Sequence, residues 1–190
     1  MANNNKIELF HDKSLELLIE GALNSAKSHI AGMDGETFKQ KSDAEILTET
    51  MGKFQFQPAH LLGDCLEIWR KEIPINTDSW IRAAYAQSYS GESALLHASY
   101  KVTAKRTIPN YQIVHVWQVE TAEDQKRIVF QIEYRNAEER DQEVNRIHAA
   151  IAIIAARIND QAEIFDNIKP EWERQLRAKI ADRRKIQGLL

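Results

Sequence analysis

"RIHAAIAIIAARIND", residues 146–160, carries the most regular hydrophobic pattern in this chain of 190 residues. Its isoleucines, Ile147, Ile151, Ile154 and Ile158, follow one another at spacings of four, three and four residues. Side chains at this spacing lie on one side of an α-helix. The stretch therefore predicts an amphipathic helix, whose apolar stripe packs either on the rest of this chain or on a second chain.

Apolar residues extend the stripe from Val144 to Ile168, with Gln161 as a polar interruption. Pro170 follows, and proline is tolerated in the first turn of a helix but not in its interior. We therefore expect a second helix to begin at Pro170 and to carry a narrower apolar stripe. Together the two segments predict a long C-terminal helix pair.

Upstream of these helices the hydrophobic pattern alternates with a period of two, which is typical of β-strands. The predicted strands are residues 54–56, 65–75, 96–104, 111–119 and 128–134. Strands with one apolar and one polar face indicate an antiparallel sheet, not a parallel nucleotide-binding sheet. We expect a meander of about four or five strands.

The N-terminal part of the chain has a helical pattern. Residues 14–31 repeat apolar side chains with the helical period, and Ser42 with Glu45 forms a capping-box signature that opens a short helix. The pattern of residues 77–87 is ambiguous, and a short helix capped by Asp78 is the preferred interpretation.

These elements predict an α+β fold with N-terminal helices, an antiparallel meander sheet and a long C-terminal helix pair packed on the sheet. Residues 1–136 would hold the first helices and the sheet, and residues 137–190 the helix pair, within one domain. The apolar face of the sheet needs a cover, and the stripe from Val144 suits it. Because the stripe is longer than the strands, its far end is left for a partner, and if this chain assembles we expect it to do so there. This candidate assembly seam comprises Gln161, Phe165, Ile168, Trp172 and Leu176.

Local motifs for the common chemistries are missing from the sequence. It contains no G-x-x-x-x-G-K-[ST], no G-x-G-x-x-G and no G-x-S-x-G. The six histidines include no pair three or four residues apart that would hold a metal from one helix. We therefore predict no catalytic residue, no metal site and no cofactor.

Cys65 is the only cysteine, which excludes an internal disulfide and fits a reducing compartment. Asp64 and Glu67 stand beside it and disfavour a thiolate, so a structural thiol is the preferred interpretation. The same carboxylates lack the Glu-x-Lys pattern of metal-dependent nucleases, because Ile68 and Trp69 follow Glu67. With no signal-peptide pattern and no apolar run of about 18 residues, we expect a cytoplasmic protein without a membrane partner.

Basic residues gather locally although the net charge of the chain is −3. They occur at the end of one predicted strand, at the start of the last predicted strand and in the last predicted helix. Such residues suit phosphate or partner contacts, but a helix dipole alone also favours basic residues at a helix C-terminus. Both readings stay open for Lys101, Lys105, Arg106, Lys126, Arg127, Arg174, Arg177, Arg183 and Arg184.

The order of these pieces resembles the N-terminal region of uncharacterised bacterial proteins that carry a C-terminal PD-(D/E)xK restriction-endonuclease-like domain. The resemblance lies in the stretches "NKIELFHDKSLELLIEGALNSAKSHIAGM", "KSDAEIL", "KFQFQPAHLLGDCLEIWRKEIPIN", "VFQIEYRNAEERDQEVNRIHAAIAIIAARINDQAEIFD" and "LRAKIADRRKI". It is a likeness of layout over nearly the whole chain, from which residues 76–125 diverge. Because the nuclease would begin after Leu190, the resemblance implies the non-catalytic part of such a protein.

The first functional hypothesis is a non-enzymatic interaction, regulatory or oligomerisation module, linked by the resemblance to a bacterial nuclease or a defence against foreign DNA. Its expected partner is a second copy or another protein, with nucleic acid as a further candidate. One alternative is a nucleic-acid-binding protein that uses a basic sheet face or the basic C-terminal helix. Another is a small hydrolase or nuclease, for which a cleft joining His97 with Glu67 or Asp64 would be expected.

Overall fold

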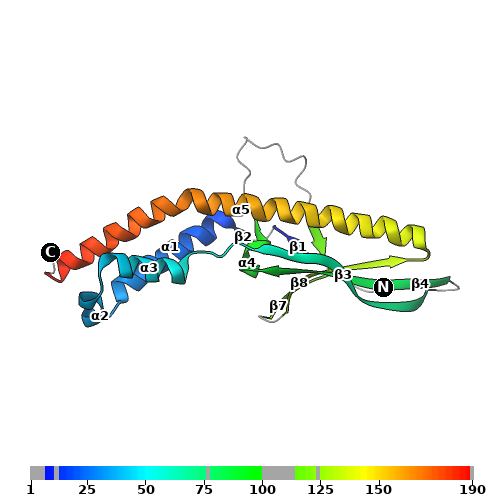
Figure 1. Cartoon of the computed structure of the whole chain (residues 1–190), viewed down its shortest axis with the longest axis horizontal. Helices are drawn as coiled ribbons and strands as arrows, with labels where there is room; N and C mark the ends of the chain where they lie inside the picture. The colour runs from blue at the N-terminus through cyan, green and yellow to red at the C-terminus, as the bar shows by residue number, and fades with distance from the viewer. Residues whose placement is uncertain (1–6, 11–12, 76–77, 100–113, 123–124, 189–190) are drawn as a thin grey trace. The chain divides into compact units, whose positions relative to one another are not determined.

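The computed structural model describes residues 7–10, 13–75, 78–99, 114–122 and 125–188 of the chain (Figure 1). The chain divides into two compact units. The sheet unit comprises residues 1–13 and 58–160, and the helical unit comprises residues 14–57 and 161–190. The predicted boundary between residues 136 and 137 coincides with the start of the last helix. The two compact units, however, meet within this helix, between Asp160 and Gln161.

A four-stranded antiparallel sheet forms the centre of the sheet unit (Figure 1). Its strands are β3 (His60–Ile75), β4 (Asp78–Ser90), β7 (Gln118–Ala122) and β8 (Gln125–Tyr134), in the spatial order β3-β4-β8-β7. This arrangement confirms the predicted α+β class and the antiparallel sheet. β4 and β8 are the inner strands, and β3 and β7 lie at the edges.

Short elements surround this sheet. β1 (Ile7–Leu9) pairs antiparallel with β6 (Val114–Val116), and the remaining elements are β2 (Lys13–Ser14), α4 (Ser93–His97) and β5 (Ala98–Ser99). The turn after β4 requires glycine at position 91, where φ is +85° and a Cβ atom would lie 2.2 Å from the carbonyl oxygen of Pro58.

The isoleucine stripe covers one face of the sheet. It belongs to α5 (Ala137–Ile186), whose first half lies in the sheet unit. Ile147, Ile154 and Ile158 are buried in one core with Phe130 and Ile132 of β8. The prediction that the stripe packs within the chain is therefore confirmed for this half of the helix.

α5 is one continuous helix, so the prediction of a second helix starting at Pro170 is wrong. A proline inside a helix removes one backbone hydrogen bond and costs about 3 kcal/mol. Phe165 before the proline and Trp172 after it are both buried. Apolar packing on either side of Pro170 offsets the local loss and keeps the helix intact.

Three local predictions are also wrong. Residues 78–87 of the predicted helix 77–87 belong to strand β4, because this inner strand is apolar on both faces and shows no alternation. Phe54 ends helix α3, so residues 54–56 form no strand. The predicted strand 96–104 begins instead in helix α4, and its residues 100–104, like residues 111–113, lie outside the described residues.

The helical unit contains α1 (Leu15–Gly32), α2 (Gly35–Gln40), α3 (Asp43–Phe54) and the second half of α5. Asp34 caps α2, and the predicted capping box of Ser42 and Glu45 is confirmed at the start of α3. Four helical segments share one apolar core, in which α1, α2 and α3 pack on α5. This core contains Ala26, Ile30, Phe38, Ile46, Leu47, Met51, Trp172, Leu176 and Ile180.

Candidate functional site

The sheet has a second face that no described helix of its unit covers. On this face Ala84, Ala86 and Val129 are buried, and Trp69 packs against them. The strand register places Leu62 and Leu66 of the edge strand on the same face, opposite Ser88 and Ala86. Their exposed fractions are 48% and 63%, respectively. We call this surface the open face and define it by Leu62, Leu66, Trp69 and Trp117.

Two tryptophans meet on the open face. The rings of Trp69 and Trp117 lie 6.4 Å apart in an edge-to-face arrangement, and Trp117 remains 39% exposed. Aromatic pairs of this geometry add about 0.5–1.5 kcal/mol to the stabilisation from buried area. The pair therefore forms a fixed apolar platform, because each ring limits the motion of the other.

Ion pairs border this platform. Arg82 of β4 lies 2.6 Å from the Glu133 carboxylate on β8, and Arg127 of β8 lies 2.6 Å from the Glu120 carboxylate on β7. The register places each pair across neighbouring strands, so positive and negative groups alternate along the border. The open face thus has an apolar centre and a border of both signs.

The free edge of β3 is poorly suited to pairing with another strand. The ladder between β3 and β4 is irregular between Leu62 and Leu66 and again between Glu67 and Trp69. Lys71 and Pro74 follow on the same edge, and proline lacks the N–H that a further strand would need. Bulges, lysine and proline are the features by which natural edge strands avoid pairing, so contacts of β3 are expected through its side chains.

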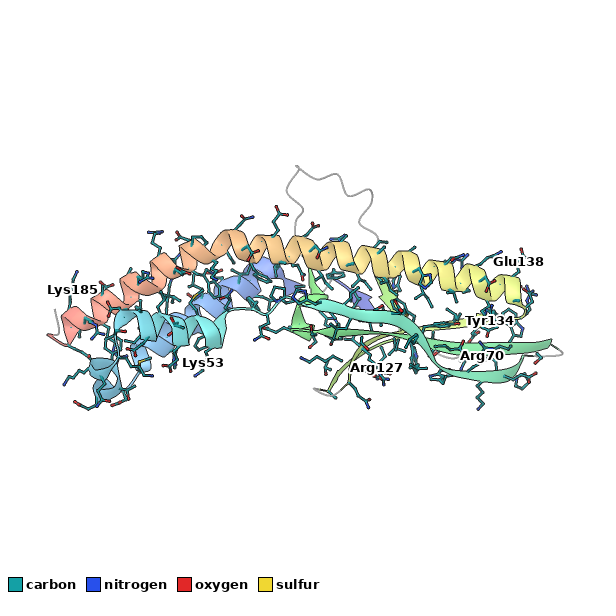
Figure 2. The ribbon with its side chains drawn as sticks, viewed as in Figure 1. Lys53, Arg70, Arg127, Tyr134, Glu138 and Lys185 are labelled. Atoms are coloured by element: carbon teal, nitrogen blue, oxygen red, sulfur yellow. The ribbon has the colours of Figure 1, made fainter. Side chains whose placement is uncertain are left out.

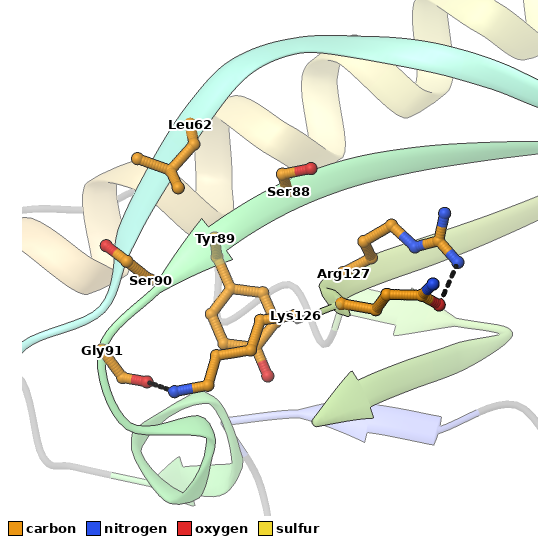
Figure 3. Close-up of a pocket in the computed structure, with 8 residues that line it drawn as sticks. Leu62, Ser88, Tyr89, Ser90, Gly91, Lys126 and Arg127 are labelled. Carbon is orange, nitrogen blue, oxygen red and sulfur yellow. Dashed lines mark hydrogen bonds between the residues drawn. The ribbon is translucent and has the colours of Figure 1, made fainter. Parts of the chain in front are cut away.

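A cavity of about 550 Å³ lies at the C-terminal end of β4 (Figure 3). Lys126 and Arg127, both candidates for phosphate contact, line it together with Ser88 and Ser90. The Lys126 ammonium donates a hydrogen bond to the Gly91 carbonyl oxygen at 2.9 Å, which fixes the tight turn after β4 (Figure 3).

Hydrogen bonds to neighbouring side chains also hold the Arg127 guanidinium in place. Its Nε atom donates to Glu120 at 2.6 Å, and Nη2 donates to the Gln125 side chain at 3.3 Å. In Figure 2 the Arg127 side chain lies on the sheet unit close to these strand ends. Lys126 and Arg127 therefore stabilise the turn and the β7–β8 hairpin, and neither directs an unpaired charge into the cavity.

Two basic candidates of the last helix hold the helical unit together. Arg184 donates to the Asp43 carboxylate and to the Lys41 carbonyl oxygen, each at 2.6 Å. Arg183 donates to the carbonyl oxygens of Ile30 and Met33 at the end of α1. Both guanidinium groups also lie over the buried Phe38 ring, at 4.5 Å for Arg183 and 5.0 Å for Arg184.

The remaining basic candidates are on the surface or outside the described residues. Arg174 is paired with Glu171 at 2.6 Å on the same helix, and Arg177 is exposed. Lys101, Lys105 and Arg106 lie outside the described residues. Among the described residues, the predicted basic side chains therefore meet only as sequence neighbours, Lys126 with Arg127 and Arg183 with Arg184, and in both pairs they are held by groups of this chain.

The candidate assembly seam packs within the chain. Trp172 and Leu176 are buried in the core of the helical unit, with Ile168 against its edge. Phe165 is buried and stacks on Phe56 at 5.1 Å, and Gln161 is only 1% exposed. These side chains therefore present little free surface. Helices α1 and α3 of the same chain cover the side of α5 on which a partner was predicted.

The groups that the alternative of a hydrolase or nuclease would use are metal-ligating side chains, the Cys65 thiol and the carboxylates beside it. The described residues contain no group of three or more metal-ligating side chains. Burial raises the pKa of the Cys65 thiol to about 11, which disfavours a nucleophilic thiolate. Hydrogen bonds from Arg70 lower the pKa of Glu67, which makes this carboxylate a weak base. A cavity lies at the end of β4, and a groove lies beside β8, between this strand, α5 and Trp117. Neither is lined by Asp64, Glu67 or His97.

The open face was missed by reasoning from the sequence. Its signal is the pair of leucines Leu62 and Leu66, which sit on either side of the "GDC" stretch. Their common face depends on the irregular ladder of β3, which no periodicity in the sequence indicates. Trp117, the fourth residue of the open face, comes from the other edge of the sheet, which no local pattern connects with the two leucines.

No described helix of this chain is both long enough and apolar enough to cross a membrane. Comparison with protein-family models, with curated proteins and with solved structures found no match to the chain.

Proposed function

We propose that this chain is a non-enzymatic assembly module that binds a second copy of itself through the open face. The observation that carries the proposal is the exposure of Leu62 and Leu66, 48% and 63%, beside the partly exposed Trp117. Single exposed apolar residues are common on protein surfaces, but a contiguous group with a polar border is typical of interaction sites. Tryptophan is also enriched where interfaces gain most of their binding energy.

The charges around the open face favour a second copy over nucleic acid. The pairs Arg82–Glu133 and Arg127–Glu120 place both signs on the border. In a twofold dimer the same surface meets itself, so a border of one sign would repel its copy and a mixed border need not. Nucleic acid would require an excess of basic residues on this face.

An enzymatic role has less support. The Cys65 pKa is raised, the Glu67 carboxylate is engaged by Arg70, and the described residues hold no metal-ligating group. The link to a bacterial nuclease or to defence against foreign DNA, which rests on the resemblance in layout, stays a prediction. The cytoplasmic location expected from the single cysteine also stays a prediction.

Sedimentation velocity of two matched variants tests the proposal. Leu66→Glu places a charge in the open face, and Leu17→Glu makes the same change at an equally exposed leucine, 67%, in the helical unit. Both side chains are on the surface, so both variants should fold, which circular dichroism checks. We expect Leu66→Glu to sediment as a monomer at concentrations where the wild type and Leu17→Glu are dimers. Equal sedimentation of all three proteins would contradict the proposal.

A further inference from the structure

We draw no further inference here: the strongest candidate, the groove beside β8 between this strand and α5, shares Trp117 with the open face already described, its two carboxylates are paired with arginines of this chain, and nothing among the described residues shows what covers it.

Discussion

The side-chain amide of Gln87 donates a hydrogen bond to the backbone carbonyl oxygen of Leu62 at 3.0 Å, across the irregular part of the β3–β4 ladder. A second bond reaches the carbonyl oxygen of Gly63 at 3.3 Å. Leu62 pairs with Ser88 and Leu66 with Ala86, so the extra residues of β3 bulge opposite Gln87. The buried amide thus takes the place of ladder bonds that the bulge removes, and it holds the backbone of Leu62 in position.

Replacing Gln87 by leucine should destabilise the sheet unit. Gln87 is 3% exposed, and its loss would remove the hydrogen bonds to the carbonyl oxygens of Leu62 and Gly63. We expect the free energy of unfolding to fall by about 1–3 kcal/mol, measured by urea denaturation. Gln118→Leu, at an exposed position of β7, is the control and should change stability by less than about 0.5 kcal/mol. Equal effects of the two changes would mean that the bulge does not need the amide.

Arg184→Ala should destabilise the helical unit. Its guanidinium contacts Asp43 and Lys41 from a side chain that is 13% exposed. Hydrogen bonds to charged groups contribute about 1.5–3 kcal/mol each, so we expect a loss of at least about 1.5 kcal/mol in urea denaturation. Arg177→Ala removes an exposed arginine of the same helix and should have little effect. If Arg184→Ala is as stable as Arg177→Ala, the contacts of Arg184 with Asp43 and Lys41 do not stabilise the helical unit.

The Glu67 carboxylate should stabilise the fold above its pKa. Hydrogen bonds from the Arg70 guanidinium, aided by the Tyr85 hydroxyl, hold the folded-state pKa of Glu67 below its ordinary value of 4.5. A depressed pKa means that the stabilisation is present above pH 4.5 and is lost as the pH falls through the lower folded-state value. Figure 2 shows Arg70 on the sheet unit.

Urea denaturation of wild type and Glu67→Gln at several pH values checks this sign. We expect the wild type to be more stable by up to about 1 kcal/mol near neutral pH, since the pair is partly exposed. The difference should shrink as the solution becomes acidic. A difference that grows in acid would have the wrong sign for a depressed pKa.

Cys65 should react slowly with thiol reagents in the folded protein. Burial raises its pKa from 9.0 to about 11, so near neutral pH it holds roughly one hundredth of the thiolate of an ordinary cysteine. The rate of alkylation by iodoacetamide, followed against pH, should have its midpoint near pH 11. Unfolding in urea should return the midpoint to about 9. A folded-state midpoint at the unfolded value would show that the thiol is not desolvated.

The fold class and the packing of α5 could be predicted from the sequence because both depend on periodicity. The stripe of Ile147, Ile154 and Ile158 is a local pattern, and so is the capping box of Ser42 and Glu45. β4 was mistaken for a helix because it is buried on both faces, and burial on both faces removes the alternation that identifies a strand.

The candidate surfaces could not be predicted, because they arise from contacts between residues far apart in the chain. The basic side chains of Arg183 and Arg184 suggested phosphate contacts, but α1, α2 and α3 supply carbonyl and carboxylate partners for them. The exposure of Leu66 depends on a bulge opposite Gln87. The groove beside β8 depends on where β7 stops pairing.

Light scattering of the wild-type chain over a range of concentrations tests the assembly proposal most directly. If the open face binds a second copy, the solution mass should rise from 21.9 kDa towards about twice that value as the concentration increases. A mass that remains at 21.9 kDa at the highest concentration would contradict the proposed function.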